Sequence, residues 1–209
     1  MVVILDYGMG NPGSILNMVR RIGGDALISS KPEDIKIASA IILPGVGSFD
    51  NGITKLHQSR MVQELEKRVI HDKVPFLGIC LGMQLIMSGS EEGELPGLGW
   101  IDGYARKFNF KNVDEDQSTL RLKVPHMGWN NVSFENNLLF NLVKPSAQFY
   151  FVHSYFIEYN PIFDIASVTY GNKFSAAIQK DNFYGVQFHP EKSGKAGEQI
   201  LKNFSNLSL

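Results

Sequence analysis

The only cysteine among 209 residues, Cys80, follows an apolar run at residues 74–77 and has a glycine two positions before it and another two positions after it, Gly78 and Gly82. Glycines at this spacing let the backbone turn sharply from a strand into a helix. A cysteine at such a turn lies at the N-terminus of the helix, where the positive end of the helix dipole favours thiolate over thiol. The sequence therefore predicts a strand, a strained turn that presents Cys80 as a nucleophile, and a helix; a buried, inert cysteine is the alternative.

A histidine and a carboxylate follow a later apolar segment at residues 183–188, in the order His189, Pro190, Glu191. Residues two apart in an extended segment point to the same side, so Glu191 can accept a hydrogen bond from one ring nitrogen of His189 while the other nitrogen faces a thiol. Pro190 keeps the residue before it extended. Because the carboxylate orients the ring and favours its protonated form, we predict that Cys80, His189 and Glu191 form a catalytic triad.

Another glycine-rich turn follows the strand predicted at residues 40–43, where residues 44–47 read Pro-Gly-Val-Gly. Ligands of open α/β sheets bind at the carboxyl ends of the strands, so this turn is expected near the nucleophile. The backbone N–H groups of Val46, Gly47 and Leu81 could then hold the oxyanion of an acyl-transfer intermediate. A simple turn at the exit of the strand is the alternative.

Strands and helices alternate in the first half of the chain. Apolar strands are predicted at residues 2–5, 25–28, 40–43 and in the run into Cys80, and helices after a cap at Ser14 and at residues 48–56 and 60–71. After residue 97 the pattern changes to aromatic and β-branched strands at residues 100–108, 120–124, 148–158, 164–170, 175–179 and 183–188, with a closing helix at 196–204. This order predicts an α/β fold: a doubly wound, mostly parallel sheet with additional antiparallel strands in the second half, in a single domain over residues 1–209.

The composition excludes several classes of protein. A formal net charge of −1 argues against a nucleic-acid partner, and 44% hydrophobic residues is ordinary for a globular chain. No apolar stretch approaches the ~18 residues of a membrane span, and the start lacks a basic signal region, so we expect a cytoplasmic protein with no membrane association. One cysteine and histidines without paired ligand spacing predict no disulfide, no metal and no cofactor. The polar stretch at residues 109–119 is predicted to be a solvated loop.

Three other interpretations compete with this one. Residues 8–13 fit the Gly-x-Gly-x-x-Gly pattern of a dinucleotide-binding oxidoreductase, but the second predicted strand is followed by Ser29 and Ser30 in place of an acid that would bind a ribose hydroxyl. A cysteine hydrolase of the α/β-hydrolase type would place its acid before the histidine, whereas here the obvious acid comes after it. A non-catalytic interaction subunit would keep the fold without needing a reactive thiol.

These motifs together resemble the class I, or triad, glutamine amidotransferases, in which Gly-x-Cys-x-Gly and a later His-Pro-Glu are the signature. The resemblance covers the chain from end to end and extends to one subfamily, the glutaminase subunits of imidazole glycerol phosphate synthases. The segments that carry it are residues 6–11, 44–47, 125–130, 150–155 and 187–194. It implies that Cys80 attacks the carboxamide of glutamine, that His189 protonates the departing ammonia and later activates water, and that Glu191 orients His189.

The resemblance also implies how the substrate is held and where the ammonia goes. Gln84, Gly47 and the consecutive residues His153, Ser154 and Tyr155 would bind the amino-acid part of L-glutamine, so that His153 is a binding residue and not a base. The ammonia would pass through an interface to a (β/α)8-barrel cyclase, with which the chain would form a heterodimer in histidine biosynthesis.

Three residues would lie at the contact with that barrel: Asn11, Trp129 and Lys192. Lys192 would pair with a carboxylate of the barrel, and a solvated lysine is the alternative. The stretch 109–119 and Trp100 depart from the subfamily pattern and resemble a paralogous group that supplies ammonia for amidation of a surface-sugar precursor. Both acceptors stay open at this point, and glutaminase chemistry is common to them.

Overall fold

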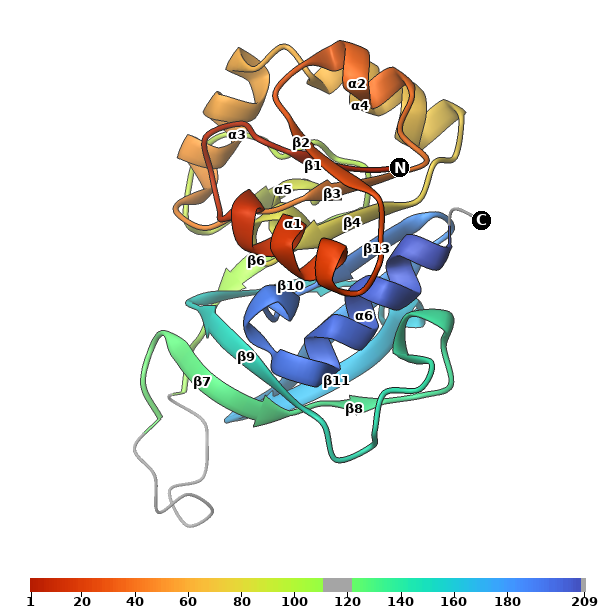
Figure 1. Ribbon diagram of the computed structural model, residues 1–209. Helices are drawn as coiled ribbons and strands as arrows, with labels where there is room; N and C mark the ends of the chain where they lie inside the picture. The colour runs from red at the N-terminus through yellow and green to blue at the C-terminus, as the bar shows by residue number, and fades with distance from the viewer. Residues whose placement is uncertain (111–121, 208–209) are drawn as a thin grey trace.

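The computed structural model describes residues 1–110 and 122–207, which form a central sheet with helices packed on it (Figure 1). The described helices are α1 (Pro12–Arg21), α2 (Pro32–Lys36), α3 (Phe49–Gln58), α4 (Val62–Glu66), α5 (Leu81–Leu85) and α6 (Gly194–Asn206), with short helical turns η1 (Lys67–His71), η3 (Leu138–Phe140), η4 (Pro161–Phe163) and η5 (Pro190–Lys192). The described strands are β1 (Val2–Leu5), β2 (Ala26–Ser29), β3 (Ala40–Leu43), β4 (Phe76–Ile79), β5 (Gly89–Ser90), β6 (Gly103–Lys107), β7 (His126–Asn131), β8 (Ser133–Phe134), β9 (Gln148–His153), β10 (Tyr155–Tyr159), β11 (Asp164–Tyr170), β12 (Asn172–Lys180) and β13 (Phe183–Val186).

The main sheet has eight strands in the order β2-β1-β3-β4-β13-β12-β11-β8. The neighbours from β2 through β13 pair in parallel, and β12, β11 and β8 add to that edge in antiparallel fashion. Two smaller sheets, β10-β6-β5 and β7-β9, accompany it. The predicted α/β class, with a parallel first half and antiparallel strands in the second half, is therefore confirmed.

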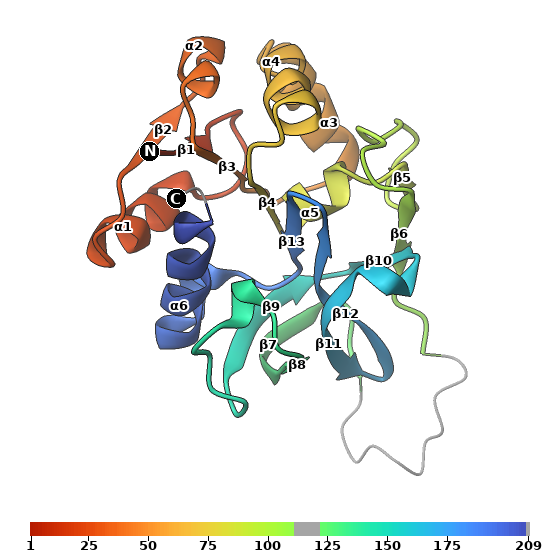
Figure 2. The same ribbon diagram turned by 90° about the vertical axis from the view of Figure 1, so that its right-hand side faces the viewer.

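Side-chain alternation along the parallel strands explains why helices cover both faces of the sheet (Figure 2). In β1, Val2 and Ile4 pack into one core with α1 and α6, whereas Val3 and Leu5 pack into the other core with α2, α3, α4 and α5. A strand buried on both faces needs an unbroken apolar run, and all four residues of β1 are at most 2% exposed. Continuous burial of this kind is the reason that the first strands could be located from sequence.

The neighbouring strands β4 and β13 determine where Cys80 and His189 lie. They run parallel, and their last residues, Ile79 and Val186, are register partners. The two chain segments that leave the carboxyl ends of these strands, one starting with Cys80 and the other leading to His189, therefore begin side by side although more than a hundred residues separate them. This is the edge at which open α/β sheets bind their ligands.

One predicted strand is wrong. The expected strand at residues 120–124 does not form at 122–124, and residues 120–121 lie outside the described part, as do residues 111–119 of the predicted acidic loop. The strand is β7, which starts directly after Pro125. Proline has no N–H to donate to a strand ladder, so it marks the boundary from which pairing can begin.

Other boundaries differ from the predictions for local reasons. Helix α1 begins at Pro12, and its cap is Asn11, whose side chain accepts a hydrogen bond from the backbone N–H of Ser14, the residue predicted as the cap. Proline at the first helical position needs no hydrogen-bond acceptor, which favours this earlier start. The helix predicted at 60–71 is divided between α4 and η1, and the long strand predicted at 148–158 is divided between β9 and β10 at Ser154.

Trp100 lies ahead of β6, outside any strand, and packs on Phe76 and Phe183 with ring centroids 5.4 and 5.8 Å away. Its role in the described structure is to pack against the main sheet. No helix among the described residues is long and apolar enough to cross a membrane.

Candidate active site

Cys80 lies between β4 and α5 with φ 52° and ψ −108°, a backbone conformation that side chains other than glycine rarely adopt. The glycines around it are required by close packing. A Cβ at Gly78 would lie 2.8 Å from the backbone of Gly82, and a Cβ at Gly82 would collide with the carbonyl oxygen of Leu43 at the end of β3. The predicted strained turn from strand to helix is therefore present, and Cys80 is at its tip.

His189 and Glu191 form a buried pair. His189 Nδ1 lies 2.8 Å from Glu191 Oε1, and the two side chains are 1% and 3% exposed. His189 has φ −101° and ψ 98°, the extended conformation expected before Pro190. A carboxylate that accepts from Nδ1 fixes the ring orientation and leaves Nε2 as the reactive nitrogen.

The remaining ring nitrogen of His189, Nε2, is buried and makes no hydrogen bond within the described residues. Burial lowers the pKa of His189, but the Cys80 thiol and the Glu191 carboxylate outweigh burial and raise this pKa to about 10. The imidazolium is thus the main form at neutral pH. A positive ring beside a cysteine favours the thiolate, which is the nucleophilic form.

A cavity of about 210 Å³ opens at Cys80. It is lined by every residue predicted to bind the substrate or the oxyanion: Val46, Gly47, Leu81, Gln84, His153, Ser154 and Tyr155. Three further lining residues were not predicted: Glu92, Pro125 and Val152. The structure thus brings together segments from five different parts of the chain around one thiol.

Backbone donors are available in this cavity. Within the described residues, the N–H groups of Val46, Gly47 and Leu81 have no protein acceptor. A hydrogen bond fixes the start of the turn that carries Val46 and Gly47, because the buried hydroxyl of Tyr7 donates to the carbonyl of Pro44 over 2.7 Å. Unpaired N–H groups next to a nucleophile are what an oxyanion site requires.

The loop of residues 8–13, which raised the dinucleotide interpretation, packs on this same turn. A Cβ at Gly10 would lie 3.1 Å from the backbone nitrogen of Gly45, and the ammonium of Lys55 donates to the carbonyl of Gly8 over 2.8 Å. Its glycines are explained by close packing against protein, and nothing in this loop favours a dinucleotide site.

His153 lines the cavity, but both of its ring nitrogens are already bonded. Nδ1 lies 2.8 Å from the carbonyl oxygen of Tyr155, so Nδ1 carries the proton and Nε2 is an acceptor. Nε2 in turn lies 3.0 Å from Nδ1 of His126, whose Nε2 is 3.3 Å from the amide nitrogen of Asn130. His153 therefore presents a ring face and backbone to the cavity, not a free nitrogen.

Both histidines of this pair are held neutral. Burial lowers the pKa of His126 to about 4. Burial is also the largest cause at His153, and with the charges of His126 and His189 it lowers that pKa to about 3, against an opposing hydrogen bond to the Tyr155 carbonyl. Neither ring is protonated at neutral pH, so neither can donate a proton as an imidazolium.

Trp129 and Lys192, two of the residues predicted at a partner contact, are joined through Tyr150. The Trp129 and Tyr150 rings meet edge to face at 6.1 Å, and the ammonium of Lys192 lies 5.6 Å from the Tyr150 ring centre. Trp129 is 54% exposed. Helix α1, which Asn11 caps, packs against η5, which carries Lys192.

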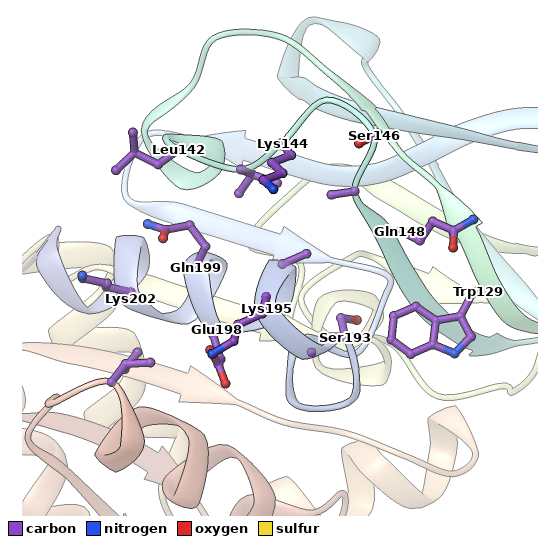
Figure 3. A pocket seen from close by; sticks show the side chains of 15 residues that line it. Trp129, Leu142, Lys144, Ser146, Gln148, Ser193, Lys195, Glu198, Gln199 and Lys202 are labelled. Carbon is purple, nitrogen blue, oxygen red and sulfur yellow. The ribbon is translucent and has the colours of Figure 1, made fainter.

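Trp129 also lines a larger cavity of about 690 Å³ between the start of α6 and the segment before β9 (Figure 3). The cavity contains none of the triad residues, and its charged lining residues are Lys144, Lys195, Lys202 and Glu198. It lies next to the surface that carries the predicted contact residues and apart from the thiol.

Comparison with known proteins decides the family. The sequence profile of the family described as "Glutamine amidotransferase class-I" matches residues 3–207. The chain belongs to the class I glutamine amidotransferases.

Curated relatives of this amidotransferase match it over nearly its whole length. It is 50% identical to "Imidazole glycerol phosphate synthase subunit HisH 2" of Methanococcus maripaludis, with 98% of each chain covered. It is 46% identical to the protein of the same name from Pseudomonas aeruginosa, with 99% of this chain and 100% of that one covered.

Solved structures match the amidotransferase fold at low identity. A crystal structure described as that of a glutamine amidotransferase superposes with a TM-score of 0.75 at 16% identity, covering 100% of this chain and 99% of that one. A chain from the structure of PurLQS from Thermotoga maritima superposes with a TM-score of 0.68 at 16% identity, covering 99% of this chain and 97% of that one. These likenesses support the fold alone.

Two buried or half-buried polar residues of the amidotransferase site were missed from sequence. Glu92 belongs to a run of acids that looks solvated, yet its carboxylate accepts from the backbone N–H of Phe49 over 2.8 Å and lines the cavity. Burial is the main cause that raises its pKa, with a smaller contribution from Asp50, against the hydrogen bond from Phe49. Gln187 is 0% exposed and lies against Cys80; its position two residues before His189 was the signal that could have found it.

Within the described residues, no group of three or more His, Cys, Asp or Glu side chains is arranged to hold a metal ion.

Proposed function

We propose that this protein is the glutaminase subunit of an imidazole glycerol phosphate synthase, that it acts in the cytoplasm, and that it hydrolyses L-glutamine for a (β/α)8-barrel cyclase partner. The observation that carries the chemistry is the buried His189–Glu191 pair, with Nδ1 and Oε1 2.8 Å apart, next to the only cysteine at a strained strand end. Relatives at 50% and 46% identity over nearly the full chain, both called HisH 2, support the pathway.

In the first half of the reaction, the Cys80 sulfur attacks the side-chain carboxamide carbon of glutamine. The carbonyl oxygen gains negative charge, which the N–H groups of Val46, Gly47 and Leu81 would stabilise. The carbon–nitrogen bond then breaks, and His189 gives its proton to the departing nitrogen, which leaves as ammonia. Because the pKa of His189 is raised to about 10, this proton is present at neutral pH before substrate binds.

In the second half, neutral His189 accepts a proton from water, and the water oxygen attacks the thioester carbon. The sulfur leaves as thiolate, glutamate is released, and His189 is again protonated. One glutamine and one water give one glutamate and one ammonia. Glu191 holds His189 in one orientation for both proton transfers.

Hydrogen bonding inside the cavity specifies how Gln84 can bind the substrate. Its Nε2 group contacts the carbonyl oxygen of Tyr155 at 3.2 Å and Oε1 of Gln187 at 3.3 Å, so both N–H hydrogens are used. Only Oε1 of Gln84 is left, and it is an acceptor. Gln84 and the carboxylate of Glu92 would therefore bind the α-ammonium of glutamine, and donors from Ser154 and Tyr155 would bind its α-carboxylate.

The partner surface would be the face on which β7 exposes Met127 and Trp129. These two side chains are 62% and 54% exposed, which is unusual for residues that large and apolar. Lys192 lies near Trp129, because both contact the Tyr150 ring. An exposed apolar centre with a lysine at its margin fits the barrel of the proposed heterodimer, with Lys192 paired to a carboxylate.

The experiment that tests the assignment mixes the purified chain with a candidate cyclase and measures glutamate release and acceptor turnover together. Glutamate release coupled to the histidine-pathway intermediate is the expected result. If glutamate release is coupled only to a surface-sugar acceptor, the assignment to the histidine pathway is wrong and the assignment as a glutaminase stands. No glutamate release with any barrel would overturn both.

A matched pair of variants tests the interface. Trp129→Ala should weaken partner binding by at least about 10-fold, because large aromatic residues at interface centres contribute most to affinity. Ile162→Ala removes an apolar side chain that is 78% exposed on η4 and should leave binding unchanged. Equal affinities for the two variants would exclude this face.

A further inference from the structure

Gln187 is the most deeply buried polar side chain next to the thiol. It follows the last residue of β13, is 0% exposed, and its backbone N–H donates to the carbonyl of Ala176 over 2.9 Å. The reaction steps above give it no role. Burying a primary amide is unfavourable unless its donors and acceptor are bonded, so the partners of this amide indicate what it does.

Its orientation follows from its neighbours. The nitrogen of the Gln84 amide is identified by its contact with the Tyr155 carbonyl oxygen, which can only accept. The Gln187 atom 3.3 Å from that nitrogen must therefore be the oxygen, Oε1. The other end of the Gln187 amide, Nε2, then lies 3.5 Å from the sulfur of Cys80 and can only donate to it.

Besides His189, the sulfur has two polar contacts of opposite kind among the described residues. Gln187 Nε2 donates to it at 3.5 Å, and the carbonyl oxygen of Val152 lies 3.9 Å away as an acceptor for the thiol hydrogen. A thiolate has no hydrogen to give to Val152 but is a stronger acceptor than a thiol for an N–H donor. Loss of the thiol proton thus weakens one contact and strengthens the other.

We propose that Gln187 is a positioning residue for acyl transfer: its N–H group holds the Cys80 sulfur and stabilises it as thiolate, while its Oε1 holds the Gln84 amide with only an acceptor facing the substrate. The proposal rests on the glutaminase function and assigns to one side chain the alignment of the nucleophile with the substrate-binding amide. Gln187 connects them through one buried amide that is hydrogen-bonded at both ends.

The titratable groups that act on this sulfur are on other elements. His189 and Tyr7 are coupled to Cys80 by charge, and His189 is oriented by Glu191. Tyr7 is buried, and burial, followed by the charge of Cys80, raises the pKa of Tyr7, so Tyr7 is neutral at neutral pH. A change at Gln187 therefore alters the N–H donor and leaves each of these groups in the chain.

The test compares three full-length variants in complex with the partner. Gln187→Met keeps the length of the side chain and removes the donor, and Gln187→Glu keeps its shape and puts a carboxylate beside the sulfur. Gln179→Met is the matched control, because Gln179 is a half-buried amide on β12 that bonds to Tyr184 and Asn137. Since Cys80 is the only cysteine, both its alkylation by iodoacetamide and its ultraviolet thiolate absorbance, with Cys80→Ser as blank, report this one site.

Gln187→Met should raise the pH of half-maximal alkylation by about one unit and slow alkylation at neutral pH about 10-fold, the loss expected for one hydrogen bond to a charged group. Gln187→Glu should raise that pH further, and the Gln179 control should match the wild type. The KM for glutamine should rise in Gln187→Met, where Gln84 loses its acceptor, and should rise less in Gln187→Glu, whose carboxylate oxygen still accepts from Gln84.

A Gln187→Met protein that melts at a lower temperature but keeps the wild-type pH profile would reduce Gln187 to a packing role and overturn the proposal. If Gln187→Met does not fold, an unchanged profile in Gln187→Glu would overturn it equally. A wild-type complex that alkylates rapidly but releases no glutamate would instead reject the glutaminase function, so the two failures are distinct.

Discussion

Two buried histidine sites lie close together in this molecule and behave in opposite ways. At His189 the pKa is raised to about 10, whereas at His126 and His153 it is lowered to about 4 and about 3. Burial acts in the same direction at all three rings. The difference comes from the partners, since His189 faces a carboxylate and a thiol, and the other two rings face each other and neutral groups.

The comparison shows how a fold separates a histidine that can transfer a proton from two that cannot. His126 and His153 have both ring nitrogens bonded, ending at Asn130 on one side and the Tyr155 carbonyl on the other. His189 has one nitrogen bonded and one without a bond within the described residues. A ring with an unused nitrogen and a stabilised charge can transfer a proton, and a ring with neither holds the cavity wall in place.

Removing the sulfur should have the largest effect on this comparison. Cys80→Ala is expected to abolish glutamine hydrolysis, with a loss of at least about 10⁴-fold, because alanine leaves no nucleophile at the end of β4. Ammonia-dependent synthesis by the complex should persist, and measuring it is the control for folding and partner binding. The pKa of His189, followed by NMR, should fall, since the thiol is one of the causes that raise it. Residual glutaminase activity near the wild-type rate would reject Cys80 as nucleophile.

Next in size are changes to the charged pair. His189→Gln should approach the loss seen for Cys80→Ala, because the acid and base steps both disappear. Glu191→Gln should cost less, on the order of 10²-fold, since an amide oxygen can still accept from Nδ1. It should also lower the pKa of His189 and move the upper limit of the pH–activity profile down from about 10. Steady-state rates across pH measure both effects, and equal tolerance of the two substitutions would refute the triad.

Acid should destabilise the neutral pair and leave the charged pair intact. The pKa values of His126 and His153 are lowered on folding, so below about pH 6.5 the unfolded chain binds protons that the folded chain does not, and stability falls as pH falls toward 4. The sign is opposite for His189: its pKa is raised, its contribution is complete below about pH 6.5, and it is lost as pH rises through about 10.

Denaturant unfolding at several pH values between about 5 and 6.5 measures the acid effect. His126→Phe keeps the stacking on Phe151 and Tyr170 and should make the slope of unfolding free energy against pH shallower, by up to about 1 kcal/mol per pH unit after solvent screening. His57→Gln, on the exposed side of α3, is the control. Parallel slopes for wild type and His126→Phe would show that the pair is not the acid-sensitive element.

The smallest expected effect concerns the backbone at the reactive site. Cys80→Gly and Cys80→Ala both remove the thiol, but only glycine adopts φ 52° without strain. The glycine variant should be more stable than the alanine variant by about 1 kcal/mol, which is about 2–4 °C in melting temperature for a chain of this size. Calorimetry of the two proteins checks this. If the glycine variant is the less stable of the two, a side chain at position 80 causes no backbone strain in this turn.

Local patterns were enough to predict the strained turn at Cys80 and the contact between His189 and Glu191. The glycine spacing around Cys80 and the two-residue spacing of His189 and Glu191 depend on turns and strand geometry that short segments dictate. The buried strands β1 and β3 were located to the residue, because a continuous apolar run has one interpretation in an alternating β/α chain.

The hydrogen-bonded pair of His126 and His153 could not be predicted from sequence, because it depends on a contact between distant segments of the chain. The role of His126 follows from its antiparallel partner, His153, on β9. Strand β7 itself was missed because its polar side chains are buried and its apolar side chains are exposed. His126 is 3% exposed, whereas Met127 is 62% exposed. That reversal is the pattern of a strand with a polar network inside and exposed apolar side chains outside, and a search for buried apolar runs assigns such a segment to a loop.

At position 80 the proposed chemistry needs a cysteine, whereas the backbone conformation favours a glycine. Glycine adopts φ 52° with less strain than cysteine, so selection for the proposed turnover would be what retains the sulfur. A copy of this gene that is no longer under that selection should lose the thiol early. Glycine would be the substitution that leaves the least backbone strain. Glycine at this one codon would therefore mark a descendant that has kept the architecture and given up catalysis.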